Sequence, residues 1–380
     1  MKSERRSATR LIVSIALALA VGVSGLLAGG AAAQTAVPYD ANGVRATALS
    51  LAPSGSTVNG TYTIDVARET HFTDVVIAVR DPAGRNYDFG NVQDVTVEPG
   101  EPVTFSSSRT LPDESYRAWI SYRTDNGAWT DLPVNRRFNV GQLPPAPPGG
   151  PWTLVFRDEF NGTTLDTGKW ATHYDRPGDL GYSNLRNGES QWYKRKNVTE
   201  AGGALQLTAR RERTVSPYSG RVFNYSSGMV TSKPSLNFRY GYLEARVQVP
   251  RGSGFWPAFW TWPSNPRFSR PEIDVFEFFG DNPSLLYGVF HSQTSGSTAT
   301  PVRTRDWTAR WHKVAVEWKP GLVTWYFDGI RRKVVAEDAT RVAYLIMNLT
   351  VSNGRHAPRP TRSTPFPAQY RVDYVRVWQR

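Results

Sequence analysis

Three acidic residues, Glu272, Asp274 and Glu277, lie within six positions of the chain and could do chemistry together. Most residues around them are β-branched or aromatic, which predicts a strand. Side chains alternate along a strand, so Glu272 and Asp274 share one face while Glu277 points to the other. One extra residue, a β-bulge near Val275 or Phe276, would bring all three acids to the same face.

With such a bulge, the two glutamates could form a catalytic pair. Four strand steps of about 3.3 Å separate their Cα atoms by about 13 Å. Side chains that lean inward would bring the carboxyl groups to roughly 5–6 Å, close to the separation between nucleophile and acid/base in a retaining glycosidase. The alternative is an exposed strand with acids on its solvent face, and this short motif alone does not decide between the two.

The composition narrows the classes of function. The chain has 380 residues, enough for two domains, and no cysteine, which excludes disulfides, thiolate metal sites and cysteine nucleophiles. Its 13 tryptophans and 17 tyrosines are a heavy aromatic load, which suits stacking on sugars. The net charge of +12 could favour an anionic polymer or could serve solubility. We find no phosphate loop, zinc spacing or basic stripe, so we expect no nucleic-acid partner.

The N-terminus is typical of a secretory signal peptide. Basic residues precede an apolar stretch from Leu11 to Ala28, and a small-residue site follows at Ala31–Ala33. We expect cleavage after residues 1–33 and a secreted monomer that has no membrane association after cleavage. The alternative is an uncleaved anchor, because the apolar stretch is nearly long enough to span a bilayer.

The rest of the chain divides into two all-β units. Residues 34–141 contain short strands about ten residues apart, which predicts a small β-sandwich of immunoglobulin or fibronectin type. This accessory domain could bind carbohydrate through Trp119, Trp129 or Tyr122, or it could be a spacer. Residues 142–151 form a proline-rich linker. Residues 152–380 read almost wholly as strands, which predicts a large β-sandwich of jelly-roll type.

An ordered series of motifs in residues 152–380 resembles glycoside hydrolase family 16. The acid motif and a nearby tryptophan-rich run, Gly254 to Trp260, are similar to those of the laminarinase-like branch. Other segments follow in the family's order: Asp158–Gly162, Asn187–Tyr193, Tyr240–Arg246, Trp325–Gly329 and Val372–Val377.

The resemblance implies a concave jelly-roll sandwich whose cleft binds a β-linked polysaccharide. It implies that Glu272 is the nucleophile, Glu277 the general acid/base, and Asp274 a helper between them. The longer ExDxxE spacing is similar to that of the bulged branch of the family, which includes laminarinases, agarases and carrageenases, and it argues against a strict lichenase. We expect a retaining endo-β-glycanase acting on a β-1,3- or β-1,3/1,4-glucan. Two alternatives remain: hydrolysis of an anionic galactan or bacterial exopolysaccharide, suggested by basic loops, and a non-catalytic carbohydrate-binding protein.

The resemblance also implies further site residues. Seven of them would contact substrate or the acids: Trp256, Trp260, Asn187, Glu189, Gln191, His291 and Asn348. We expect His291 to hydrogen-bond the acid/base or a sugar hydroxyl. Catalysis should need no cofactor, but a structural Ca²⁺ could bind the carboxylate of Asp373 with backbone oxygens of Glu159 and Gly203.

Overall fold

The computed structural model describes residues 37–380 apart from residues 82–83, 91, 126 and 142–143. The predicted signal peptide, 1–33, lies outside the described residues. Among the residues described, no helix is long and apolar enough to cross a membrane.

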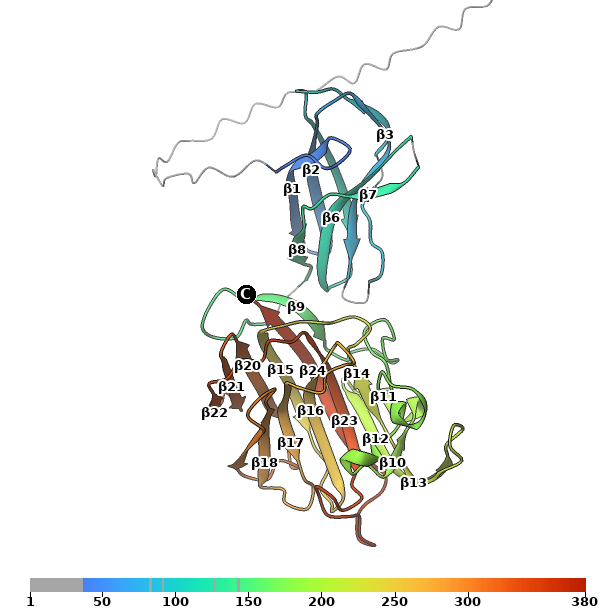
Figure 1. Ribbon diagram of the computed structural model, residues 1–380, viewed down its shortest axis with the longest axis vertical. Coiled ribbons are helices and arrows are strands. Elements are labelled where there is room, and N and C mark those ends of the chain that lie inside the picture. Colours follow the sequence, from blue (N-terminus) through green and yellow to red (C-terminus); the bar gives the residue numbers. More distant parts are fainter. Residues whose placement is uncertain (1–36, 82–83, 91, 126, 142–143) are drawn as a thin grey trace, which may run out of the picture. The chain divides into compact units, whose positions relative to one another are not determined.

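The N-terminal part is a small sandwich with its own core. One sheet has the order β1-β2-β5, and the other has the order β4-β3-β6-β7, with β8 also paired to β6 (Figure 1). Most of the buried hydrophobic residues of 44–140 form one cluster. Its type, immunoglobulin or fibronectin, stays a prediction. Tyr122 is only 1% exposed and so cannot be a sugar platform. The strands are β1 Val44–Ser54, β2 Thr57–Val66, β3 Thr70–Arg80, β4 Val92–Val97, β5 Val103–Thr110, β6 Ser115–Thr124, β7 Trp129–Asp131 and β8 Arg136–Asn139.

The C-terminal part confirms the predicted all-β sandwich. A ten-stranded sheet has the order β10-β13-β12-β24-β15-β20-β21-β22, with β11 on β12 and β9 on β24. A six-stranded sheet has the order β14-β23-β16-β17-β18-β19. The strands are β9 Thr153–Asp158, β10 Gln191–Tyr193, β11 Val198–Glu200, β12 Leu205–Val215, β13 Val222–Ser227, β14 Met229–Thr231, β15 Gly241–Gln248, β16 Phe255–Pro263, β17 Glu272–Phe278, β18 Leu285–His291, β19 Ser297–Arg303, β20 His312–Lys319, β21 Leu322–Phe327, β22 Ile330–Val335, β23 Ala343–Val351 and β24 Ala368–Gln379.

Helical structure in the described part of the chain is limited to three short 3-10 turns. These are η1 Gly178–Gly181, η2 Leu185–Asn187 and η3 Arg195–Asn197. All three lie between β9 and β11, so the rest of the C-terminal part is strands and loops.

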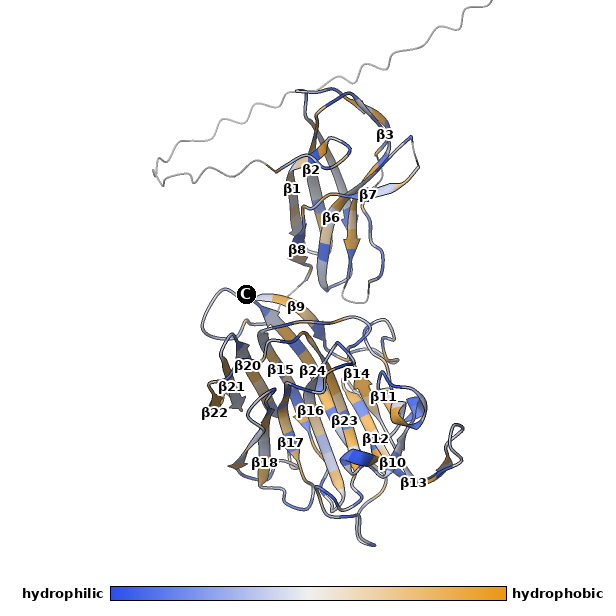
Figure 2. Cartoon of the chain, in the orientation of Figure 1, coloured by the Kyte–Doolittle hydropathy of each residue, from blue (hydrophilic) through white to orange (hydrophobic). Residues whose placement is uncertain are grey.

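Alternating side chains build the core between the two large sheets. In β15, Leu243, Ala245 and Val247 are fully buried, while the residues between them are partly exposed. Residues from both sheets join a single hydrophobic cluster. Figure 2 shows apolar residues gathered on the strands and polar residues in the connecting loops. Burial of this apolar surface is the main favourable term that holds the two sheets together.

The predicted bulge is present in β17. Between Asp274 and Glu277, β17 advances three residues while its partner β18 advances two. On the other side, β17 again has one residue more than β16. The two residues within the bulge, Val275 and Phe276, are both fully buried. Two consecutive side chains therefore point into the core, and Glu277 returns to the face that carries Asp274.

Candidate active site

The three acids of β17 form one electrostatic cluster. Glu272 and Glu277 are partly exposed, whereas Asp274 between them is only 3% exposed. The bulge places them on the face of the six-stranded sheet that points away from the core. Each acid is close enough for its charge to affect the pKa of a neighbour. The arrangement meets the geometric expectation for the motif, while the individual catalytic roles stay predictions.

His291 lies on the Glu272 side of this cluster. It ends β18 and is paired in register directly with Glu272. Its Nε2 is 3.1 Å from Asp274 Oδ2 and 3.9 Å from Glu272 Oε1. Its Nδ1 is 2.6 Å from Ser297 Oγ, which fixes the ring. We expected a contact with the acid/base or a sugar, but the structure places His291 beside the other two acids.

Trp256 provides the polar contact to Glu277. Its indole Nε1 donates a hydrogen bond to Glu277 Oε1 at 3.0 Å. The ring packs against Phe279 and His356, with centroids 5.7 and 5.6 Å away. Trp256 is 7% exposed, so it holds the acid in place while showing little of its surface to solvent.

A second tryptophan anchors a buried polar network beside the acids. Trp260 Nε1 donates to Asn348 Oδ1 at 2.7 Å. The amide nitrogen of Asn348 donates to Tyr193 Oη at 3.0 Å and Thr350 Oγ1 at 2.9 Å. The oxygen of the Asn348 amide thus binds Trp260, while the nitrogen of the same amide is held by Tyr193 and Thr350. Because Asn348 is 4% exposed, its contact with a sugar stays a prediction.

The surface continues from Trp260 to Trp262. Their rings meet edge to face, with centroids 5.5 Å apart. Trp262 is partly exposed, and the Arg176 guanidinium lies 5.1 Å from its ring centroid. A pocket of about 430 Å³ opens beside it, lined also by Lys233, Arg267 and other residues of the 263–269 loop.

The prediction for the Asn187–Gln191 element was partly wrong. We expected three residues on one face of a strand at the cleft. Instead, Asn187 is an exposed residue of η2, and β10 begins only at Gln191. Glu189 and Gln191 are 1% and 0% exposed, so they do not offer groups to a sugar.

Glu189 and Gln191 instead hold loops together. The carboxylate of Glu189 accepts hydrogen bonds from Tyr174 Oη at 2.6 Å and from the backbone of Asn184 at 2.7 Å. Gln191 donates to Glu189 and accepts from the Val351 backbone at 2.8 Å. Burial raises the pKa of Glu189, although these donors oppose the rise.

Burial and mutual repulsion set the protonation of the acid cluster. Desolvation first, and then the charge of Asp274, raise the pKa of Glu277 to about 8, although the Trp256 hydrogen bond opposes this rise. The pKa of Glu272 is also raised, by burial and then by Asp274 and Glu277. Three adjacent carboxylates in this partly desolvated site cannot all be charged cheaply at neutral pH, so we expect the cluster to retain at least one proton.

Two residues of the ten-stranded sheet support the six-stranded sheet from the core side, and neither was predicted as a site residue. Trp325 Nε1 donates to the backbone oxygen of Asp274 at 2.8 Å. Lys333, opposite Trp325 in register, lies over its ring and donates to the backbone oxygens of Gly288 and Thr298.

The close packing of these groups explains the glycine in β18. A Cβ on Gly288 would lie 2.7 Å from Trp325 Cδ1, which is too close for any larger residue. Burial lowers the pKa of Lys333 to about 8, although the charge of Asp274 opposes the fall. The Lys333 ammonium therefore stabilises a negative charge on Asp274 in return.

The one carboxylate predicted to bind calcium already has a cation as its partner. The Asp373 carboxylate is paired with Arg246 Nη1 at 2.8 Å. Glu159 and Gly203 would offer backbone oxygens only, and the Glu159 carboxylate is paired with Arg376 at 2.7 Å. Calcium needs six to eight oxygen ligands, so these three residues do not complete a site by themselves, and the calcium site stays a prediction.

Comparisons with known proteins decide the family. The model of glycosyl hydrolases family 16 matches residues 186–376, half of the chain. The chain belongs to glycosyl hydrolase family 16. It is therefore a glycoside hydrolase, and enzymes of this family generally need no cofactor for catalysis.

Two relatives of this chain have names that describe enzymes acting on β-glucans. It is 32% identical to glucan endo-1,3-beta-glucosidase A1 of Niallia circulans, over 60% of this chain and 38% of that protein. It is 30% identical to a beta-glucanase of Rhodothermus marinus, over 60% of this chain and 85% of that protein. It spans well under two thirds of the first relative.

A solved structure agrees with the fold. The endo-beta-1,3-glucanase from Pyrococcus furiosus superposes with a TM-score of 0.55 at 31% identity, covering 60% of this chain and 94% of that one. The match supports the laminarinase-like branch of the family.

Replacing Trp256 by phenylalanine should move the alkaline limb of the pH–rate profile upward. The indole N–H stabilises the charged carboxylate of Glu277, so its loss raises the pKa of Glu277 above about 8. The measurement is kcat/KM on a soluble β-glucan from pH 5 to 10. Trp262→Phe is the matched control, since Trp262 has no hydrogen bond to Glu277. If the alkaline limb of the profile has the same apparent pKa in Trp256→Phe as in the wild type, Glu277 does not determine that limb.

Replacing Trp325 by phenylalanine should lower kcat as well as stability. The backbone oxygen of Asp274 loses its donor, which costs about 1–3 kcal/mol of unfolding free energy. Trp318→Phe is the control, because the buried Trp318 indole donates to Ala339 O at 3.0 Å, away from the acids. Denaturant unfolding should show similar losses in both variants, and kcat should fall only in Trp325→Phe. Equal effects on kcat would assign Trp325 a purely structural role.

Proposed function

We propose that the chain is a retaining endo-β-glycanase that hydrolyses a β-1,3- or mixed β-1,3/1,4-glucan. The observation that carries the proposal is the bulged strand β17, which brings two partly exposed glutamates to one face with different partners. Glu277 has a pKa raised to about 8 and a single indole donor, so it is protonated near neutral pH. Glu272 lies on the other side of the cluster, next to Asp274 and the His291 imidazole.

These surroundings suit a double displacement. Glu277 donates its proton to the glycosidic oxygen while a Glu272 carboxylate oxygen attacks the anomeric carbon, so the C–O bond to the leaving sugar breaks. Glu277, now a carboxylate, takes a proton from water, and the water oxygen displaces Glu272 from the anomeric carbon. The enzyme returns to its starting protonation state. Glu272 must be a carboxylate when it attacks, and the His291 imidazole lies on its side of the cluster, with Nε2 3.9 Å from Glu272 Oε1.

The same proposal covers the site's surroundings and the enzyme's location. Trp262 and the adjoining pocket offer a partly exposed ring and several cations where further sugar units would lie. The relatives' names support a β-glucan substrate.

A polymer of this kind cannot enter a cell, so residues 1–33 support export. Intact residues 1–33 on protein collected from the medium would contradict export by signal cleavage.

A polysaccharide panel tests the substrate. Laminarin, lichenan, agarose, κ-carrageenan and a bacterial exopolysaccharide are incubated with the enzyme, and reducing ends are counted. We expect release from laminarin first and lichenan second. Proton NMR of the first product should show the β-anomer, since two displacements retain configuration. Release from carrageenan alone would replace the glucan with an anionic galactan, and an α-anomer would exclude the retaining mechanism.

Variants of the glutamates separate a wrong substrate from a wrong site. Glu277→Gln should lower kcat roughly 10²–10⁴-fold, the usual contribution of a general acid. Glu244→Gln, a partly exposed glutamate on β15 of the ten-stranded sheet, is the matched control and should retain wild-type rates. Near-normal rates in Glu277→Gln, on any polymer that the wild type cleaves, would move the acid/base elsewhere.

A further inference from the structure

Three arginines lie next to each other across adjacent strands of the small sandwich. Arg80 of β3 is directly opposite Arg117 of β6, and Arg117 is directly opposite Arg137 of β8. Like charges directly opposite one another destabilise a sheet. The pKa of Arg137 is lowered by partial burial and then by the Arg117 guanidinium, which reflects this repulsion.

Only one of the three charges is neutralised within the protein. Arg80 forms an ion pair with Asp88. Arg117 and Arg137 are both exposed, and neither forms an ion pair with any residue that the structure describes. Two adjacent strands therefore present two positive charges that lack an internal counterion.

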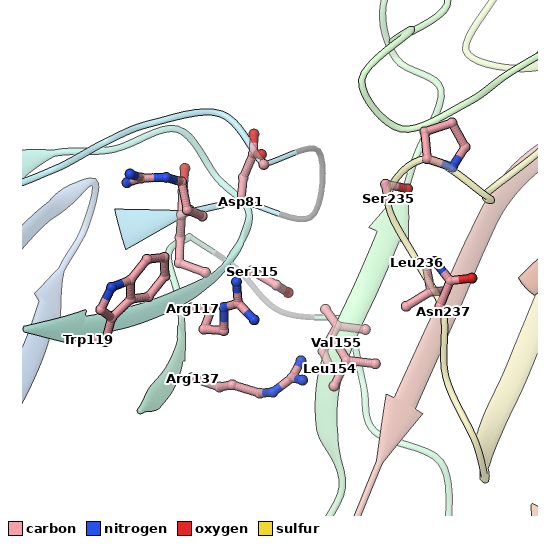
Figure 3. A pocket seen from close by; sticks show the side chains of 14 residues that line it. Asp81, Ser115, Arg117, Trp119, Arg137, Leu154, Val155, Ser235, Leu236 and Asn237 are labelled. Carbon is pink, nitrogen blue, oxygen red and sulfur yellow. The ribbon is translucent and has the colours of Figure 1, made fainter. Parts of the chain in front are cut away.

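A tryptophan on the same face holds this row in place. The guanidinium carbons of Arg80 and Arg117 lie 5.3 and 5.0 Å from the ring centroid of Trp119. Such cation–π contacts fix the planes of the guanidinium groups and leave their N–H donors free. The indole nitrogen of Trp119 is itself buried without a partner in the described part of the chain. Figure 3 shows Arg117, Trp119 and Arg137 on neighbouring strands of the small sandwich.

A second aromatic group lies farther along this face. Side chains alternate along β6, so Arg123 shares the face of Arg117 and Trp119. Trp129 of β7 is directly opposite Arg123 and is 51% exposed. Six strand steps separate Arg117 from Arg123, a span of about 20 Å. Arg123 is engaged by Asp74, so Trp129 provides a stacking surface next to a neutralised pair.

We propose that this face of β3, β6, β7 and β8 binds an anionic polysaccharide. Arg117 and Arg137 would hold one carboxylate or sulfate group, and Trp129 would stack on a sugar ring of the same chain. The span of about 20 Å between the two features calls for a polymer rather than a small ion. A half-exposed indole about 20 Å from an unpaired arginine pair on the same face suits a charged polymer whose sugar rings can also stack. This site goes beyond the proposed hydrolysis, because it uses none of the residues of β17.

Equilibrium binding of the full chain to immobilised polymers tests the proposal. The probes are alginate for carboxylates, κ-carrageenan for sulfates and pullulan as a neutral polymer, all at one fixed salt concentration. We expect binding to at least one anionic polymer and none to pullulan. The anionic polymer with the lower Kd identifies the group, carboxylate or sulfate, that the site prefers. Arg117→Gln/Arg137→Gln should weaken that binding about tenfold or more. Trp129→Ala should weaken it as well.

The control is Arg68→Gln/Arg136→Gln, which removes the same net charge from the same sandwich. Arg136 neighbours Arg137 on β8 but points to the opposite side of the strand. This control should bind like the wild type. Equal weakening by both double variants would reduce the effect to net charge and overturn the proposal. Absence of binding by the wild type, or equally tight binding of double-stranded DNA through the same arginines, would also overturn it.

Thermal unfolding shows whether a loss of binding reflects misfolding. Arg117→Gln/Arg137→Gln relieves the cross-strand repulsion, so without polymer its Tm should equal or exceed that of the wild type. The anionic polymer should raise the Tm of the wild type and not that of this variant, because only a bound ligand stabilises the native state. A polymer-induced shift of equal size in both proteins would place the site elsewhere.

Discussion

The bulge in β17 requires two consecutive side chains to be buried on the same side of one strand. Val275 and Phe276 meet that requirement by filling the core between the sheets. Their burial fixes the register change, and the register change returns Glu277 to the face of Asp274. The arrangement of the three acids therefore depends on core packing, because the burial of Val275 and Phe276 sets the register of β17.

Electrostatics then acts on a geometry that is already rigid. Bringing three carboxylates together in a partly desolvated place costs free energy, and the protein limits that cost with a few fixed donors and cations. Trp256 contacts Glu277 from the same sheet, and His291 contacts Asp274 from the neighbouring strand. Lys333 adds a positive charge from the opposite sheet. Each partner affects one acid more than the others, which separates their protonation behaviour.

The fold class, the bulge and the position of the acids could be predicted from the sequence, because they follow from local spacing and strand alternation. The burial of Glu189 and Gln191 could not be predicted from the sequence, because it depends on loops and strands that contact them through Tyr174, Asn184 and Val351. Lys333 lies in β22, Ile330–Val335, where three consecutive basic residues indicate a solvent-exposed strand. Only its register with Trp325 shows that it is buried. The pairing of Asp373 with Arg246 could not be predicted either, because it depends on which strands are neighbours.

The contacts of Trp325 and Lys333 with the six-stranded sheet have a wider consequence. They make the β21–β22 hairpin, at the edge of the ten-stranded sheet, a mechanical support for a strand in the other sheet. The β21 residues Val323, Trp325 and Phe327 are fully buried members of the main core, so this hairpin is fastened to the core and not to the sheet edge alone. A change at the edge of one sheet is therefore transmitted through the core to the strand of the other sheet that carries the acids.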